Sequence, residues 1–226
     1  ILNGLQALTN KVSLAMTVSR SSSSEYSVSV GGSAGFSIPV GDFFTLGISS
    51  SASYMHDTIV TSSNSVSIDM DFTGVTLVQY APAAFNSSTD QNWFYMEPIL
   101  QAIKNKEQDV SGFKFSPKPS IDFSNSGPFG LMQGVAIANY PTITITVQSS
   151  DYESIATTIN ETTNVTLSFL GIPLAGASGS MYSHKTSTNS SDGSVTITLS
   201  PPSDLVAGTS LDSQGWILGV QTDYPA

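Results

Sequence analysis

The chain has 226 residues, no cysteine and a formal net charge of −10, because seven Lys and Arg face seventeen Asp and Glu. The lack of cysteine excludes disulfide frameworks, thiolate metal sites and cysteine nucleophiles. An acidic surface repels nucleic-acid phosphates and anionic lipid headgroups, so we expect neither nucleic acid nor a membrane surface as a partner. Only 11% of the residues are charged, and forty serines and 22 threonines supply most of the polar groups.

Six segments alternate polar and apolar residues with a period of two. Such runs, when rich in β-branched residues and bounded by Ser, Gly, Asn or Pro, are typical of half-buried strands. The six segments are residues 12–19, 26–30, 65–72, 142–147, 164–169 and 194–199.

One segment, residues 90–106, has helical spacing. Asp90 can act as its N-cap, and apolar residues recur on one face through Leu100 and Ile103. Pro98 lies inside this segment and predicts a kink or a restart of the helix. Residues 111–130 follow with three prolines, which predict an ordered loop.

Short motifs recur along the chain at a nearly constant spacing. Four early segments match later ones at offsets of 128 to 134 residues, among them His56 with His184 and residues 65–68 with residues 194–197. We infer a tandem duplication with repeat one at 12–141, repeat two at 142–226, and an insertion in repeat one at about 79–128. The predicted fold is a single compact all-β domain over 1–226. It is an internally duplicated antiparallel β-sandwich or barrel-like fold with pseudo-twofold symmetry and one short helical insertion.

The two histidines of the chain both follow a tyrosine by two residues, in Tyr54-Met55-His56 and Tyr182-Ser183-His184. Two interpretations are open. The imidazoles and phenols can converge as catalytic hydrogen-bond donors, or both histidines can be structural copies on equivalent strands. Zinc takes three or four protein ligands, so two imidazoles predict no metal site.

Other catalytic patterns give weaker predictions. No Gly-x-Ser-x-Gly elbow lies on a strand-to-helix turn, so we do not expect a serine triad. No glycine-rich phosphate loop lies between a strand and a helix, so we expect no nucleotide cofactor, and we expect no cofactor of any other kind. Glu97 has aromatic and apolar neighbours and is either an acid–base group or a solvated helix residue. Asp69 and Asp71 share one face of a strand, which is a weak calcium pattern.

Aromatic residues and methionines gather in and around the predicted insertion. Trp93, Tyr95, Phe129 and Met132 suit the wall of an apolar substrate pocket, and the other interpretation is that they plug one open end of the sandwich. In the pocket interpretation, Tyr54, His56, Tyr182 and His184 would form the catalytic wall. The expected partner is then a hydrophobic small molecule.

The texture of the whole chain, rich in Ser and Thr, β-patterned and free of cysteine, is similar to that of the fungal hetero-Diels–Alderases of tropolone–sesquiterpenoid pathways. The resemblance implies a cofactor-free cyclisation by cycloaddition in an apolar pocket, part of natural-product biosynthesis. Shape and a few donors would carry such a reaction. The resemblance assigns a catalytic role to no particular residue of this chain.

The alternative function is that of a secreted carbohydrate-binding, adhesin or filament-forming β-sandwich protein without catalysis. A homo-oligomer built by strand exchange fits this alternative. Four Asn-x-Ser/Thr sequons, at Asn86, Asn160, Asn164 and Asn189, are candidate glycosylation sites and agree with secretion. The Ser/Val alternation of residues 12–32 is also similar in texture to the insertion hairpins of β-pore-forming toxins, an assignment against which the duplication argues.

Overall fold

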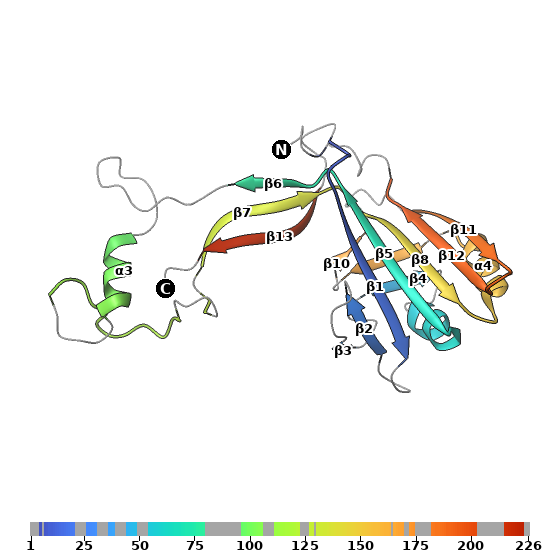
Figure 1. The fold of residues 1–226 in the computed structure, drawn as a ribbon, viewed down its shortest axis with the longest axis horizontal. Coiled ribbons are helices and arrows are strands. Elements are labelled where there is room, and N and C mark those ends of the chain that lie inside the picture. Colours follow the sequence, from blue (N-terminus) through green and yellow to red (C-terminus); the bar gives the residue numbers. More distant parts are fainter. Residues whose placement is uncertain are drawn as a thin grey trace. The chain divides into compact units, whose positions relative to one another are not determined.

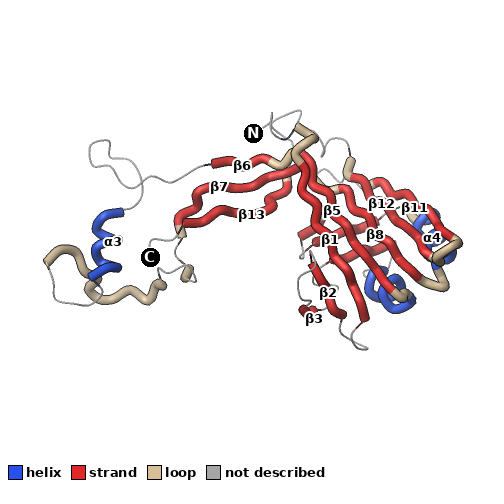
Figure 2. Tube along the Cα trace, in the orientation of Figure 1, coloured by secondary structure: helices blue, strands red, loops and turns tan. Residues whose placement is uncertain are grey.

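A computed structural model describes most of the chain. The described residues are 5, 7–20, 26–30, 36–38, 44–48, 54–79, 96–105, 111–122, 127–128, 130–163, 165–169, 172–174, 182–202 and 215–223. Strands predominate among them (Figure 2). The all-β class predicted from the sequence is therefore confirmed.

Within these residues the structure has thirteen strands and three helices. The strands are β1 (Lys11–Arg20), β2 (Tyr26–Val30), β3 (Phe36–Ile38), β4 (Phe44–Ile48), β5 (Ser65–Thr73), β6 (Thr76–Gln79), β7 (Leu131–Ala138), β8 (Thr142–Gln148), β9 (Val165–Phe169), β10 (Ile172–Pro173), β11 (Ser183–Asn189), β12 (Ser194–Ser200) and β13 (Trp216–Asp223). The helices are the π-helix η1 (Met55–Val60) and the α-helices α3 (Met96–Asn105) and α4 (Tyr152–Glu161). All six predicted strands are confirmed, as β1, β2, β5, β8, β9 and β12.

The largest sheet has seven strands in the order β11-β12-β8-β5-β1-β2-β3, and each neighbouring pair is antiparallel (Figure 1). The strand register places apolar side chains side by side on one face, as in the row Met16, Ile68, Ile145 and Ile197. All four of these side chains are buried. Because side chains alternate along a strand, this one face collects the buried apolar residues of β1, β5, β8 and β12.

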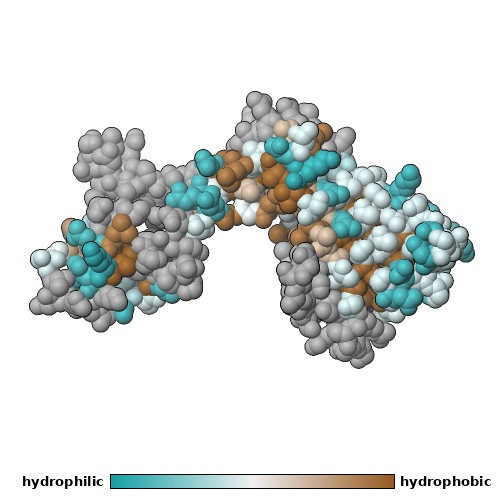
Figure 3. All heavy atoms as spheres, in the orientation of Figure 1, coloured by the Kyte–Doolittle hydropathy of each residue, from teal (hydrophilic) through white to brown (hydrophobic). Residues whose placement is uncertain are grey.

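The opposite face of this sheet is lined by hydroxyl side chains. Thr17, Ser67, Thr146 and Thr196 form one such row, with their side chains exposed or half-buried. Figure 3 shows this face as a mostly pale surface, the colour of residues with intermediate hydropathy. One face of this sheet meets water and the other meets the core. Successive residues point to opposite faces, which accounts for the period of two in the sequence.

A second layer covers the apolar face. It contains the three-stranded sheet β10-β9-β4, whose Leu46 and Leu167 are opposite each other and buried. Helix η1 contacts β4 as well as β1 and β5, and helix α4 contacts β11 and β12. Two helices and a small sheet therefore form the other half of a sandwich-like core.

The chain divides into two compact units. Unit 1 comprises residues 1–75 and 138–216, and it holds the seven-stranded sheet and its covering layer. Unit 2 comprises residues 76–137 and 217–226, with helix α3 and most of the three-stranded sheet β13-β7-β6. The predicted insertion at 79–128 falls inside unit 2. The duplication and its repeats at 12–141 and 142–226 stay predictions.

Near its end, β5 is joined to the N-terminal segment by one buried amide. The Nδ2 of Asn139 donates to the carbonyl oxygen of Leu5 at 2.9 Å, and the backbone N–H of Asn139 donates to the carbonyl of Thr73. Gly74 follows with φ of +65°, and a Cβ there would collide with the Leu5 carbonyl oxygen. Only glycine fits both this backbone conformation and this close approach.

The helices differ from the sequence predictions. Within the described residues the 90–106 segment is helical from Met96 to Asn105, and Pro98 is part of this stretch. The kink or restart at Pro98 stays a prediction. The sequence patterns predict neither η1 nor α4. Among the described residues, no helix is both long and apolar enough to cross a membrane.

Candidate functional site

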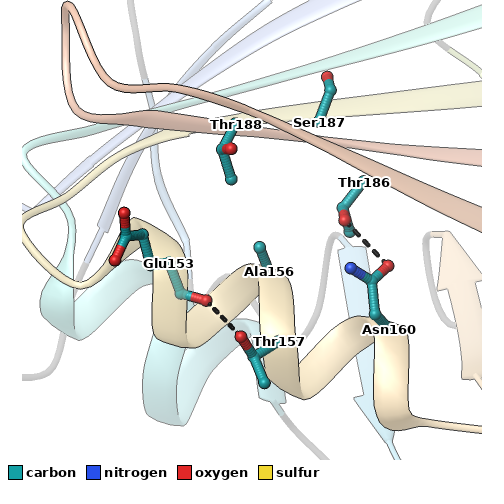
Figure 4. A pocket seen from close by; sticks show the side chains of 7 residues that line it. All are labelled: Glu153, Ala156, Thr157, Asn160, Thr186, Ser187 and Thr188. Atoms are coloured by element: carbon teal, nitrogen blue, oxygen red, sulfur yellow. Dashed lines mark hydrogen bonds between the residues drawn. The ribbon is translucent and has the colours of Figure 1, made fainter.

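A polar cleft lies between helix α4 and the edge strand β11 of unit 1 (Figure 4). Its volume is about 450 Å³. It is lined by Glu153, Ala156, Thr157, Asn160, Thr186, Ser187 and Thr188. All of these except Ala156 have a hydrogen-bonding side chain.

The amphipathic pattern of α4 fixes one wall of this cleft. Ile155 and Ile159 are buried against the sheet, as is Ala156. Residues 153, 157 and 160 follow one another at spacings of four and three, so they share a flank of the helix beside that buried stripe. The three polar side chains are therefore presented along one line at the edge of the core.

The pleat of β11 provides the other wall. Thr186 and Thr188 point toward the helix, whereas the side chain of Ser187 points to the other side of the strand (Figure 4). Strand residues alternate in this way, so Ser187 contributes to the cleft mainly through its backbone. β11 is an edge strand of the seven-stranded sheet, so it has a neighbouring strand on one side only, and α4 lies against it.

Hydrogen bonds orient two of the lining side chains. The Thr186 hydroxyl donates to Oδ1 of Asn160 at 2.9 Å, and the amide nitrogen of Asn160 consequently points back into the cleft (Figure 4). The Thr157 hydroxyl donates to the backbone carbonyl of Glu153 at 2.9 Å. This leaves the Thr157 oxygen able to accept a bond from a ligand.

Glu153 is the charged residue of the lining. Its carboxylate accepts a hydrogen bond from the Tyr152 hydroxyl at 3.1 Å, and this bond raises the pKa of Tyr152 above 10.0. The cleft thus combines a carboxylate acceptor near one end, an amide donor at the other and hydroxyls between them. Such a set can hold a ligand that donates and accepts several hydrogen bonds.

Both tyrosines of the predicted catalytic wall are buried in unit 1. The Tyr182 hydroxyl donates to the carbonyl oxygen of Pro141 at 3.0 Å, and burial raises its pKa well above 10.0. Tyr54 is hydrogen-bonded to the side chain of Thr158 on α4, and burial raises its pKa as well. Each phenol holds a backbone or a helix in place, and their predicted catalytic role stays a prediction.

The two histidines lie in different kinds of element. His56 belongs to the π-helix η1, and its side chain is outside the described atoms. His184 is on strand β11, half-buried and opposite Leu199. The interpretation that both occupy equivalent strands is wrong. Residues 54–62 form helical turns, which the matching of short motifs did not reveal.

The predicted apolar wall is described only in part. Trp93, Tyr95 and Phe129 lie outside the described residues. Met132 is half-buried on β7 of unit 2. The apolar pocket stays a prediction.

The remaining candidates are also placed. Asp69 and Asp71 are on the hydroxyl-lined face of β5, and the Ser13 hydroxyl donates to the Asp71 carboxylate. The side chain of Glu97 lies outside the described atoms. Among the sequons, Asn160 and Asn189 are described and exposed, whereas Asn86 and Asn164 lie outside the described residues.

Sequence reasoning missed the cleft because it missed α4. Asn160 is recognisable in the sequence only as a sequon, and no sequence motif includes Glu153 or Thr157. One signal was present: apolar residues at 155, 156 and 159 with polar residues between them have helical periodicity.

Comparison with known proteins assigns no family to the chain. It matches no family model, no curated protein and no solved structure.

Proposed function

We propose that the protein is a non-catalytic carbohydrate-binding protein of the secretory pathway, and that the cleft between α4 and β11 holds the sugar. The observation that carries the proposal is the lining of the cleft. The side chains of Glu153, Thr157, Asn160, Thr186 and Thr188 surround the small apolar surface of Ala156.

The chemistry of this lining matches a polyhydroxylated ligand. Each sugar hydroxyl donates one hydrogen bond and accepts others, so it needs partners of both kinds within a small space. A carboxylate accepts several bonds, a carboxamide donates and accepts, and a threonine hydroxyl does both. The methyl groups of the threonines and Ala156 offer small contacts to the carbon skeleton of the ring.

Charge narrows the class of sugar. The cleft has the Glu153 carboxylate, no lysine or arginine belongs to its lining, and the chain has a net charge of −10. Like charges repel, so uronic and other acidic sugars are disfavoured. The proposed ligand is a neutral sugar.

The affinity for a single sugar unit is expected to be weak. Glu153, Thr157 and Asn160 are exposed, and water competes for exposed hydrogen-bonding groups. A dissociation constant on the order of 1 mM corresponds to about −4 kcal/mol and is a reasonable expectation for such a site. Tighter binding would require several copies of the cleft in one assembly.

Saturation-transfer NMR tests the proposal directly. Unglycosylated protein from a bacterial host would be mixed with a panel of methyl hexosides, methyl N-acetylhexosaminides and methyl uronides. We expect transfer to at least one neutral glycoside, and weakening of that binding by threefold or more in Glu153→Gln.

Glu161→Gln is the matched control. It makes the same charge change on the same helix, at an exposed residue that is not part of the cleft lining. Equal loss of transfer in the two variants would contradict a role for the cleft. Absence of transfer to every neutral glycoside at 10 mM would contradict carbohydrate binding by this site.

A further inference from the structure

Two described sequons have different geometries. Asn189-Ser190-Ser191 lies where β11 ends and the turn to β12 begins. Asn160-Glu161-Thr162 lies at the C-terminal end of α4. An N-glycosylation sequon is read through its asparagine amide and the hydroxyl two residues later, so the placement of these two groups decides how well each sequon is presented.

In the turn, the two groups are presented together. Oδ1 of Asn189 accepts hydrogen bonds from the backbone N–H of Ser191 at 3.1 Å and from the Ser191 hydroxyl at 2.7 Å. Both residues are exposed. The sequon hydroxyl is therefore already directed at the amide that would be modified.

The amide nitrogen of Asn189 also keeps a hydrogen for the linkage. Nδ2 donates one N–H to Oδ2 of Asp192 at 3.0 Å. A carboxamide nitrogen carries two hydrogens. Replacing the second one by a sugar leaves the bonds to Ser191 and Asp192 intact, so the turn tolerates the modification.

In the helix, the two groups are separated. The Thr162 hydroxyl donates back to the carbonyl oxygen of Thr158 at 2.8 Å, and Thr162 is only 8% exposed. Oδ1 of Asn160 accepts from Thr186, and its nitrogen points into the cleft (Figure 4). On the folded protein, this sequon has no accessible hydroxyl beside its amide.

The direction of the two asparagines strengthens the difference. Residues 186 and 188 of β11 point toward α4, so by alternation Asn189 points to the other side of the strand. A glycan there leaves the cleft open, whereas a glycan on Asn160 would fill it.

We propose that Asn189 is an N-glycosylation site of this protein, and that it is used in preference to Asn160. In the reaction, Nδ2 of Asn189 forms a bond to the anomeric carbon of an oligosaccharide carried on a lipid pyrophosphate. The bond from that carbon to the pyrophosphate oxygen breaks, and the pyrophosphate leaves with the electron pair. The amide proton passes to a base of the transferase. The inference rests on the proposed secretory location of the protein, and it does not depend on carbohydrate binding by the cleft.

Site-specific mass spectrometry tests the proposal. The chain would be secreted from a yeast host, and its glycans would be released enzymatically in ¹⁸O-water, which marks each formerly modified asparagine. We expect the mark on Asn189 in most molecules and at least fivefold less on Asn160. Occupancy that is equal at the two sites, higher at Asn160, or absent from Asn189 would overturn the proposal.

Paired variants separate the sequon from the fold. Ser191→Ala should abolish the mark on Asn189, and Ser191→Thr, which keeps the hydroxyl, should retain it. Thr162→Ala removes the corresponding hydroxyl of the helix sequon and should leave the total glycan mass nearly unchanged. Retention of the Asn189 mark in Ser191→Ala, or loss of a whole glycan in Thr162→Ala, would each contradict the proposal.

Discussion

The two compact units contain similar strands but differ in how deeply their apolar residues are buried. Among the described hydrophobic residues, about thirty are buried, and Ala102 is the one that belongs to unit 2. Strands of unit 2 instead carry exposed apolar side chains, at Leu77, Ile217 and Val220. In Figure 3, brown side chains are visible along β6, β7 and β13, whereas the sheet of unit 1 is mostly pale.

The difference shows that a second layer, more than strand pattern, determines burial. In unit 1, η1 contacts β1 and β5, and α4 contacts β11 and β12, and the apolar face of this sheet is buried. Within the described residues, the sheet of unit 2 lacks a comparable row of fully buried side chains. The apolar sequence of β13 by itself gives no core.

The largest contrast should come from truncating one isoleucine in each unit. Ile145 is 0% exposed in the middle of the seven-stranded sheet, and Ile217 is 63% exposed on β13. Ile145→Ala removes buried methyl groups and leaves a cavity, so we expect a loss of about 2–5 kcal/mol in the free energy of unfolding. Ile217→Ala should cost less than about 0.5 kcal/mol. Urea denaturation followed by circular dichroism measures the free energy of unfolding of both variants. Similar losses in the two variants would contradict the difference in burial between the units.

A second pair compares buried and exposed amides. Asn139 in unit 1 and Asn105 in unit 2 each donate to a backbone carbonyl at 2.9 Å, of Leu5 and Phe113 respectively. Asn139→Ala leaves a buried carbonyl without this donor and should cost about 1–3 kcal/mol. Asn105→Ala exposes its carbonyl to water and should cost under about 1 kcal/mol. Thermal melts of the two variants measure these losses. A larger decrease in melting temperature for Asn105→Ala than for Asn139→Ala would mean that unit 2 is the better packed unit.

The smallest stability effect concerns the buried phenol of unit 1. Tyr182→Phe removes the bond to Pro141 and should cost about 1 kcal/mol near neutral pH. The folded pKa of Tyr182 is raised above 10.0 by burial, so the folded state binds this proton more tightly than the unfolded state does. The contribution is complete below pH 10 and falls as the pH rises above it.

Unfolding measured between pH 8 and pH 11 tests this dependence. The wild-type protein should lose stability more steeply above pH 10 than Tyr182→Phe does. Parallel curves would mean that the Tyr182 pKa is ordinary.

Much of the sheet could be predicted from the sequence because its signal is local. In residues 142–147 and 194–199, Ser or Thr alternates with Ile, Val or Leu, and the boundaries of β8 and β12 follow within a residue or two. A strand with one face in water and the other in the core requires polar and apolar residues to alternate. The sequence pattern and the strand therefore have the same physical cause.

The helices and the cleft could not be predicted in the same way. Helix α4 has three β-branched residues in succession, Thr157, Thr158 and Ile159, and such residues have modest helix propensity. Packing of Ile155 and Ile159 on the sheet decides in favour of the helix. The cleft requires α4 to lie against β11, a contact between segments about thirty residues apart, and no local pattern encodes it.

The pairing of β5 with β8 has a consequence for synthesis of the chain. β5 ends at Thr73 and β8 begins at Thr142, so 68 residues lie between the end of one strand and the start of its partner. At about 5–20 residues per second, the ribosome needs roughly 3–14 s to deliver β8. During that interval a nascent β1–β5 pair would have an open strand edge and an uncovered row of Val, Ile, Met and Phe side chains. An edge of this kind recruits other strands, so the newly made chain is expected to need chaperone protection until its second half emerges.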